Sequence, residues 1–441
     1  MIPPATQSPP SRPAFRRTYQ ALLRPAPVVE RPPLALPLWV HLLVLAGLAA
    51  LAFDIGRGMW GWSYDDAFII YRYARNIVEG HGMVYNPGEY YLGTTSAGYT
   101  LLLAGLHFVL PWLDFPALGS LISAVCIGIS GAALWGLGMQ TRTPLAGLLA
   151  ALITTATPLT VQSWGGEMPL LTALVMSAIY CYSRGAGTAT GVLLSLAVLT
   201  RQDTVLLAGL VGLHYLYTRR RIPWRAGIAG VLVMLPWLAY SWATFGSPLP
   251  GTLEAKLVQG KAGWPLYLSG TLNWLAATIG PDLLPRLVVL ALVAAGAITL
   301  AVLRLRRWPL DPWLLVVGWG VAFSAGYTVL RLPFYIWYTV PLGVGAGILL
   351  AWGIAGIAQL GAFLVARAVA RPADPPAEPA NGRPALLRPA AVVSLGIALL
   401  LAAPIAAQVR AYDTLWYTIP RGPDLYEQLG DWFAQHGGPQ T

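Results

Sequence analysis

The sequence predicts an all-α protein that crosses a membrane many times. Of its 441 residues, 56% are hydrophobic and only 10% are charged, and its mean hydropathy is +0.60. Apolar runs of about 18 or more residues with few charges are typical of transmembrane helices, and such runs recur along most of the chain. This pattern excludes a set of soluble domains and directs the search for function to the polar segments between the runs.

The apolar runs define the candidate membrane spans. They lie near 35–55, 116–139, 143–163, 168–184, 187–201, 203–218, 225–245, 284–303, 310–330, 335–369 and 389–408. The run 335–369 is too long for one upright span, so we expect it to tilt or to continue as a cytoplasmic helix.

Basic residues predict the orientation of these spans. The net charge of +10 comes almost entirely from arginine, and Arg and Lys accumulate on cytoplasmic loops, so we favour this interpretation over nucleic-acid binding. The clusters are the N-terminal arginines, 219–225 and 304–307. All three fall inside only if the run Tyr99–Trp112 does not cross. It is about 14 residues long, short for a span, and we expect it to lie in or dip into the outer interface. About eleven crossings then remain.

The remaining segments complete the domain plan. Residues 1–34 are rich in Pro and Arg and predict a disordered cytoplasmic tail. The main transmembrane core covers 35–345, and 346–408 adds C-terminal spans around a Pro/Ala-rich cytoplasmic linker at 371–388. An outer tail, 409–441, follows and looks like the start of a truncated domain. The two cysteines lie inside apolar runs and predict core residues, not a disulfide.

The segment Ser63–Gly98 concentrates charge beside a span, where ionisable groups are costly and usually functional. Its spacing predicts a helix that runs to about Glu79. Asp65 and Asp66 have two interpretations. Ser63 and Asp66 fit a helix-capping box, whereas adjacent carboxylates also suit a general base or a site for a hard divalent cation. Capping does not explain the charged face that continues through Arg72.

Four other outer segments carry ions or aromatic rings. Glu167 is a helix-start acid or a functional group. Arg201 and Asp203 either satisfy each other or leave Arg201 free for a phosphate. Lys256 is a headgroup anchor or a ligand for a phosphorylated substrate. Arg331 and Tyr335 belong to an aromatic belt or to a platform for sugar rings.

These motifs together resemble the GT-C-type integral membrane glycosyltransferases, and most closely the bacterial branch that includes terminal arabinofuranosyltransferases. The matching segments, in family order, read DDAFIIYRYARNIVEGHGMVYNPGE, GTTSAGYTLLLA, GGEMPLLTAL, LTRQD and GSPLPGTLEAK. The resemblance implies a helical core with two interfacial helices in the first outer loop. It departs from the family at Gln202, where Pro is common, and at Gly251, where Asn is common.

The resemblance also implies a reaction. Members transfer a sugar from a polyprenyl-phosphate donor to a glycan, lipid or protein acceptor, with inversion, outside the bacterial cytoplasmic membrane. Asp65 and Asp66 would be catalytic, and Asp65 is our first choice as the base. No cofactor is required, although the two aspartates could hold a Mg or Ca ion. The implied substrate-binding residues are Arg72, Glu89, Glu167, Arg201, Asp203, Lys256, Arg331 and Tyr335.

Two other functions fit a polytopic membrane protein. A transporter or flippase of lipid-linked saccharides would show paired repeats and broken helices in matching halves, and the sequence shows no such symmetry. A structural scaffold would not need the carboxylate cluster. We therefore expect an enzyme whose N-terminus is inside the cell and whose active site is outside.

Overall fold

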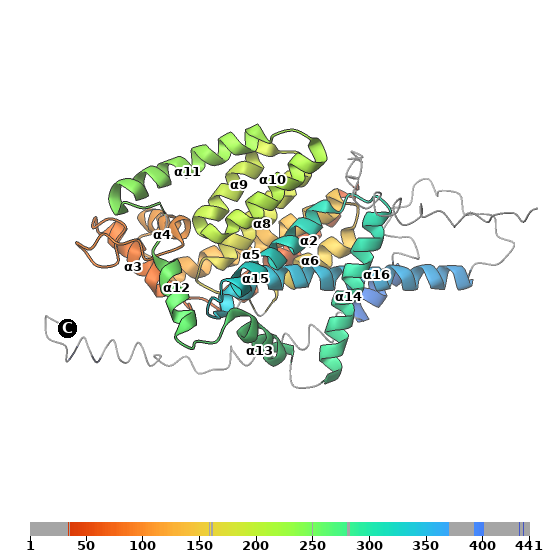
Figure 1. Cartoon of the computed structure of the whole chain (residues 1–441). Helices are drawn as coiled ribbons and strands as arrows, with labels where there is room; N and C mark the ends of the chain where they lie inside the picture. The colour runs from red at the N-terminus through yellow and green to blue at the C-terminus, as the bar shows by residue number, and fades with distance from the viewer. Residues whose placement is uncertain are drawn as a thin grey trace, which may run out of the picture.

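The computed structural model describes residues 36–369, with gaps at 158, 160–161, 249 and 280–282, as well as 34, 392–400, 432 and 435. The predicted linker 371–388 lies outside the described residues. The predicted N-terminal and outer tails also lie outside them, except for residues 34, 432 and 435. Within the described ranges the chain is helical and contains no β-strand; one isolated bridge joins Leu266 and Pro333. The predicted all-α class is confirmed (Figure 1).

Each predicted span contains a helix. The helices are α2 (Leu38–Gly58), α5 (Phe115–Gln140), α6 (Pro144–Thr155), α8 (Met168–Ser183), α9 (Gly187–Thr200), α10 (Val205–Arg219), α11 (Trp224–Phe245), α14 (Leu283–Leu305), α15 (Asp311–Val329) and α16 (Val340–Val369). Residues 392–400 are helical within the last predicted span. Among the described residues, 6 helices are long and apolar enough to cross a membrane. The predicted number of crossings stays a prediction, because α6, α8, α9 and α10 are shorter.

The long run 335–369 forms a short 3-10 helix, η2 (Ile336–Thr339), followed by α16. With 30 residues, α16 is about 45 Å long at 1.5 Å per residue. The hydrocarbon core of a bilayer is only about 30 Å thick. This helix therefore has to tilt or extend beyond the membrane, as its length in the sequence predicts.

Glycines allow the closest helix contacts in the bundle. Gly138 of α5 faces Gly147 of α6, and a Cβ on Gly138 would lie 2.6 Å from the Cα of Gly147. Gly296 of α14 faces Gly353 of α16, and a Cβ on either glycine would collide with backbone of the other helix. Small residues let transmembrane helices approach closely, which strengthens packing where the hydrophobic effect does not drive association.

Polar contacts divide the helix ends into two groups. The end of α9, the start of α8 and the end of α15 meet through Arg201, Glu167 and Tyr327, and we call this the site end. The opposite group joins the ends of α10 and α14 to the start of α15, through contacts of Asp311 with His214 and Arg304. It carries the connections 219–225 and 304–307, and we call it the arginine end. Figure 1 shows the site end with α3 and α12 on the left, away from the α10–α11 connection.

Helix α4 (Ala97–Val109) begins and ends at the site end. Near its start, a Cβ on Gly98 would lie 3.0 Å from the backbone of Leu199, which is close to the end of α9. Near its end, the His107 ring stacks on Phe115, the first residue of α5, at 4.9 Å. Both ends of α4 lie on the same side of the bundle, which is the arrangement that a non-crossing segment requires.

Helix α3 (Ala67–Val78) matches the predicted helix, but its start does not match the predicted cap. Asp66 occupies the N-cap position and makes no side-chain cap hydrogen bond. The Ser63 hydroxyl instead bonds the Tyr71 hydroxyl at 2.7 Å. The capping-box interpretation is therefore wrong, and helix capping does not explain the carboxylates of Asp65 and Asp66.

The segment 246–283, expected only as a loop, contains two helices. They are α12 (Thr252–Lys261) and α13 (Tyr267–Ile279), and both pack near the site end. The sequence of α12, TLEAKLVQGK, lacks the apolar run by which the spans could be recognised. Its residues are accordingly half-buried or exposed in the structure. This helix is nevertheless the element that carries Lys256.

The position of α4 predicts the side of the membrane on which the exposed residue Trp112 lies. In a background without Cys126 and Cys181, we expect Trp112→Cys to react with a membrane-impermeant maleimide from the same side as Trp264→Cys. Arg306→Cys, at the arginine end, should react only from the opposite side. Labelling of intact and opened cells measures this. Reaction of Trp112→Cys on the Arg306 side would show that α4 crosses.

Candidate active site

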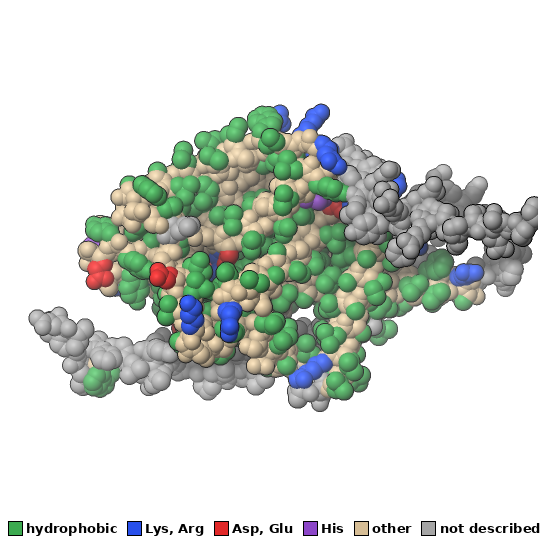
Figure 2. All heavy atoms as spheres, viewed as in Figure 1, with side chains coloured by type: hydrophobic (Ala, Val, Ile, Leu, Met, Phe, Trp, Pro, Cys, Tyr) green, Lys and Arg blue, Asp and Glu red, His purple; other side chains and the backbone are tan. Residues whose placement is uncertain are grey.

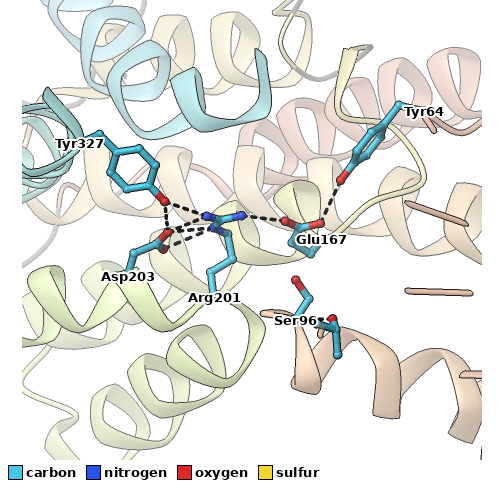
Figure 3. A network of polar contacts seen from close by, with 7 residues as sticks. Tyr64, Ser96, Glu167, Arg201, Asp203 and Tyr327 are labelled. Carbon is cyan, nitrogen blue, oxygen red and sulfur yellow. Dashed lines mark hydrogen bonds and ion pairs between the residues drawn. The ribbon is translucent and has the colours of Figure 1, made fainter. Parts of the chain in front are cut away.

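A buried arginine organises the site end. Arg201 is 4% exposed, and its guanidinium donates to Glu167 Oε1 at 2.9 Å and to Asp203 Oδ2 at 2.6 Å. It also donates to the Tyr327 hydroxyl at 3.0 Å, and that hydroxyl donates to Asp203 at 2.7 Å. The ring of Tyr338 lies against the guanidinium, 5.1 Å from its central carbon. Figure 3 shows the contacts of Arg201 with Glu167, Asp203 and Tyr327.

The local backbone explains how Arg201 reaches the interior. Helix α9 ends at Thr200, Arg201 itself is extended, and the 3-10 turn η1 (Gln202–Thr204) begins directly after it. This tight corner places Arg201 and Asp203 two residues apart with their side chains in contact. Of the two interpretations of this pair, the geometry favours internal pairing, because four of the five guanidinium N–H donors already have partners.

Glu167 joins this network to the segment before α3. It is 3% exposed and stands at the N-cap of α8 without a cap hydrogen bond. Its Oε2 accepts from the Tyr64 hydroxyl at 3.0 Å. Burial raises the pKa of Tyr64 well above its usual value, and the negative charge of Glu167 adds to the increase. Tyr64 therefore remains a hydrogen-bond donor at neutral pH.

The turn before Glu167 positions both outer helices. The carbonyl of Gly165 accepts from the hydroxyls of Tyr71 in α3 and Tyr99 in α4, each at 2.6 Å. Gly165 has a positive φ of 77°, and a Cβ there would collide with the Ser63 hydroxyl. Glycine is required here for both reasons. One backbone oxygen therefore holds α3 and α4 against the start of α8.

The two aspartates of the first motif differ in their surroundings. Asp65 is exposed, and its Oδ1 accepts from the backbone N–H of Asp66 at 2.9 Å. Asp66 is half-buried. Burial raises the pKa of its carboxyl, the negative charges of Asp65 and Glu167 add to the increase, and the positive charge of Lys256 opposes it. The carboxyl of Asp66 is thus influenced by charges from other elements, namely Glu167 and Lys256.

Lys256 faces the same region from α12. Its Nζ lies 3.8 Å from the centre of the Tyr335 ring, a cation–π contact. The Tyr335 hydroxyl donates to Gln259 of α12 at 3.0 Å, and its ring lies 4.9 Å from that of Trp337. Trp337 in turn packs against Tyr64 at 4.6 Å. Aromatic rings therefore connect Lys256 to the carboxylate network.

Three predicted substrate-binding residues lie apart from this network. Arg72 is exposed and donates to the Tyr85 carbonyl at 3.2 Å. Glu89 is exposed and accepts from Asn86 at 3.0 Å, so both brace the loop after α3. The side chain of Arg331 is exposed. No contact of the described residues brings these three side chains to Arg201 or Asp66.

Sequence reasoning missed several residues of the site. Tyr64 lies in the charged segment Ser63–Gly98 and Tyr338 lies three residues after Tyr335, but nothing in the sequence marked either tyrosine as a partner of a buried ion. Tyr327 lies within the apolar helix α15, where no neighbouring charge marks it. A charge buried between helices needs partners from other helices. This rule predicts that Arg201 has such partners, but it does not identify Tyr327 as one of them.

No group of three or more His, Cys, Asp or Glu side chains in the described ranges is placed to hold a metal ion. The pair Asp65 and Asp66 offers carboxylate oxygens alone. A divalent cation would have to complete its coordination with substrate phosphate and water, as Mg²⁺ commonly does.

Comparison with solved structures defines the fold. ArnT from Cupriavidus metallidurans, solved by crystallography in the apo state, matches with a TM-score of 0.51 at 15% identity, over 85% of this chain and 74% of ArnT. The Archaeoglobus fulgidus oligosaccharyltransferase tethered with an acceptor peptide gives a TM-score of 0.49 at 13% identity, over 90% of this chain and 59% of that one. No family model and no curated protein matches the sequence.

The chain therefore has the fold of ArnT, which is the GT-C architecture that the motifs predicted. At this identity the likeness establishes the architecture. The assignment to the arabinofuranosyltransferase-like branch stays a prediction.

The burial of Arg201 predicts a large effect on stability. Arg201→Ala leaves the buried Glu167 and the half-buried Asp203 without a cationic partner, and we expect the free energy of unfolding to fall by about 3–5 kcal/mol. Arg57→Ala is the matched control, because Arg57 pairs with Asp54 while their side chains are 73% and 70% exposed, and surface pairs contribute at most about 1 kcal/mol. Thermal unfolding of the purified proteins compares them. Equal effects of the two substitutions would contradict a structural role for the network.

Proposed function

We propose that this protein is an inverting membrane glycosyltransferase that moves a sugar from a polyprenyl-phosphate donor to an acceptor hydroxyl. The observation that carries the proposal is the place of Asp66 in a GT-C fold. This half-buried carboxylate is electrostatically coupled to Glu167 and Lys256, which come from different elements at one end of the bundle. A base beside a cation is the pairing that such a transfer needs.

In the proposed reaction, Asp66 accepts the proton of the acceptor hydroxyl. The oxygen then attacks the anomeric carbon of the donor as the bond from that carbon to the phosphate oxygen breaks. The phosphate leaves with the electron pair, and the new glycosidic bond has the opposite configuration. The raised pKa of Asp66 makes it a stronger base than an ordinary aspartate, because catalytic efficiency rises as the pKa of the base approaches the working pH.

Lys256 is the proposed partner of the departing phosphate. Its ammonium lies over the Tyr335 ring, so it is held in place without a carboxylate partner in the described residues. A cation that no protein carboxylate neutralises remains available to the negative charge that develops on a leaving group. Tyr335 supplies an aromatic face beside Lys256 that suits a sugar ring.

Glu167, Arg201 and Asp203 are proposed as positioning residues. Their mutual contacts hold α8, α9 and α10 in register, and the link from Glu167 to Tyr64 fixes the segment that carries Asp66. Glu167 also adds to the raised pKa of Asp66 through its charge. We place this reaction on the outer face of a bacterial cytoplasmic membrane, with a glycan, lipid or protein as acceptor.

The proposal predicts different effects for the two aspartates. Asp66→Asn should reduce the rate of transfer by about 100- to 10,000-fold, the usual contribution of a general base, whereas Asp65→Asn should retain more activity. Purified protein with a panel of polyprenyl-phosphate sugars, read out as covalent glycoside product, tests this and separates a transferase from a flippase. The same assay with and without a chelator tests for Mg or Ca. Full activity of Asp66→Asn would overturn the mechanism.

Stability measurements separate a catalytic from a structural effect of Asp66. Its pKa is raised in the folded protein, so its stabilising contribution is present at low pH and is lost as the pH rises through the folded-state pKa. At neutral pH, Asp66→Asn removes an unfavourable buried charge and should keep or raise the unfolding temperature. An inactive variant that also unfolds at a lower temperature would contradict the proposed role.

The rate of transfer should depend on pH through Asp66. The base has to be ionised, so the rate should fall on the acid side at a higher pH than for an ordinary aspartate. Lys256 opposes the rise in pKa, and Lys256→Gln should therefore move this acid limb to still higher pH. Lys261→Gln, on the exposed end of the same helix, is the control and should leave the limb unchanged. No shift in the Lys256 variant would show that the two groups do not interact.

A further inference from the structure

A large cavity lies at the arginine end, on the opposite side of the bundle from Asp66. Its volume is about 1530 Å³, and it is lined by the α5–α6 and α8–α9 connections, by α9, α10 and α11, and by the start of α15. It arises because α11 packs against α9 whereas α10 packs against α15, so the two helices separate beyond their short connection. Pockets for small ligands usually measure about 300–1,000 Å³, so this space suits a larger, elongated molecule.

The lining of the cavity is amphipathic. Its apolar wall includes Val231, Leu235 and Leu238 of α11, which are 60%, 55% and 37% exposed. Its rim holds five exposed arginines from three different connections between helices. They are Arg142, Arg184, Arg219, Arg221 and Arg225. A long apolar groove with positive charge at one end matches the shape and polarity of a lipid with an anionic head.

No carboxylate among the described residues neutralises the arginines on the rim. None of them forms an ion pair with a carboxylate in the described part of the chain. The one carboxylate of the lining, Asp311, is already bonded to Arg304 at 2.6 Å and lies 3.3 Å from His214. Figure 2 shows basic side chains gathered over the α10–α11 connection. Basic residues at this end could act only to orient the chain in the membrane. That function does not require an apolar groove beside them.

We infer that this cavity binds an anionic glycerophospholipid from the leaflet at the arginine end. Its phosphate lies among the arginines of the rim, and an acyl chain occupies the groove between α10 and α11. Arg219 and Arg221 at the end of α10 supply the charge, and Gly212 leaves room for the chain. Basic pockets between transmembrane helices on the cytoplasmic side are known to take such headgroups. The inference does not depend on the proposed transferase activity.

The headgroup part of the inference is tested by lipid titration of the full-length protein in detergent, followed by native mass spectrometry. Dioleoylphosphatidylglycerol should bind more tightly than zwitterionic dioleoylphosphatidylcholine. Replacement of both Arg219 and Arg221 by Gln should weaken it about 30-fold, from roughly a factor of five for each arginine near a membrane surface. The control replaces Arg306 and Arg307 by Gln, which removes equal charge from the same end outside the cavity, and should leave binding unchanged.

The groove is tested separately with glycines of α10. Gly212 lines the cavity, and a Cβ there meets nothing within 4 Å, so Gly212→Trp or the smaller Gly212→Leu should fill the groove and weaken phosphatidylglycerol binding. Gly209 is equally open but does not line the cavity, so Gly209→Trp should bind like the wild type. Inorganic phosphate should not compete with the lipid.

Four results would overturn the inference. Equal binding of the two lipids would mean that the arginines do not recognise the charge of the headgroup. Equal weakening by the control pair Arg306 and Arg307 would mean general attraction to charge. Unchanged lipid binding in both Gly212 variants would mean that no acyl chain enters the groove. Displacement of the lipid by inorganic phosphate would assign the arginines to a soluble anion.

Discussion

The structure of the site end depends on the pairing of one buried guanidinium. Arg201 is 4% exposed, and an unpaired charge at such a position would cost several kcal/mol. Glu167 and Asp203 neutralise it. The Tyr327 hydroxyl accepts a hydrogen bond from Arg201 and donates one to Asp203. These partners come from α8, η1 and α15, so the electrostatic requirement of one side chain brings three elements to a common point. Tyr64 extends the same network to the segment that begins α3.

The composition of this network has a consequence for the neighbouring carboxylate. Two carboxylates and one guanidinium carry a formal charge of −1, so the network does not present positive charge to Asp66. Glu167 instead contributes to the raised pKa of Asp66, and Lys256 of α12 counteracts it. A residue that seemed from its type to serve a phosphate therefore serves the architecture, and the lysine on a separate helix remains as the cation nearest to the proposed chemistry.

The sequence was sufficient to predict that the apolar runs form helices and that a helix runs from Ala67 to Val78, because apolar runs and charge clusters record how a chain meets a bilayer. It was also sufficient to mark Asp66, Glu167 and Arg201 as unusual. It could not show that Arg201 would be saturated by Glu167, which is 34 positions away, because a spacing in sequence does not state which helices are neighbours. Helix α12 escaped prediction for a related reason: its pattern is neither apolar enough for a span nor periodic enough for a buried face.

Arginine has opposite functions at the two ends of the bundle, and burial decides which one it performs. At the site end, Arg201 is enclosed, so it must be neutralised within the protein and becomes a rigid connection between helices. At the arginine end, Arg219 and Arg221 are exposed and lack carboxylate partners in the described ranges, so their charge acts on the surroundings. The same residue type therefore stabilises the interior at one end and, at the other, leaves positive charge exposed at the surface. A change of arginine to glutamine should consequently alter folding at the first end and interactions with lipid at the second.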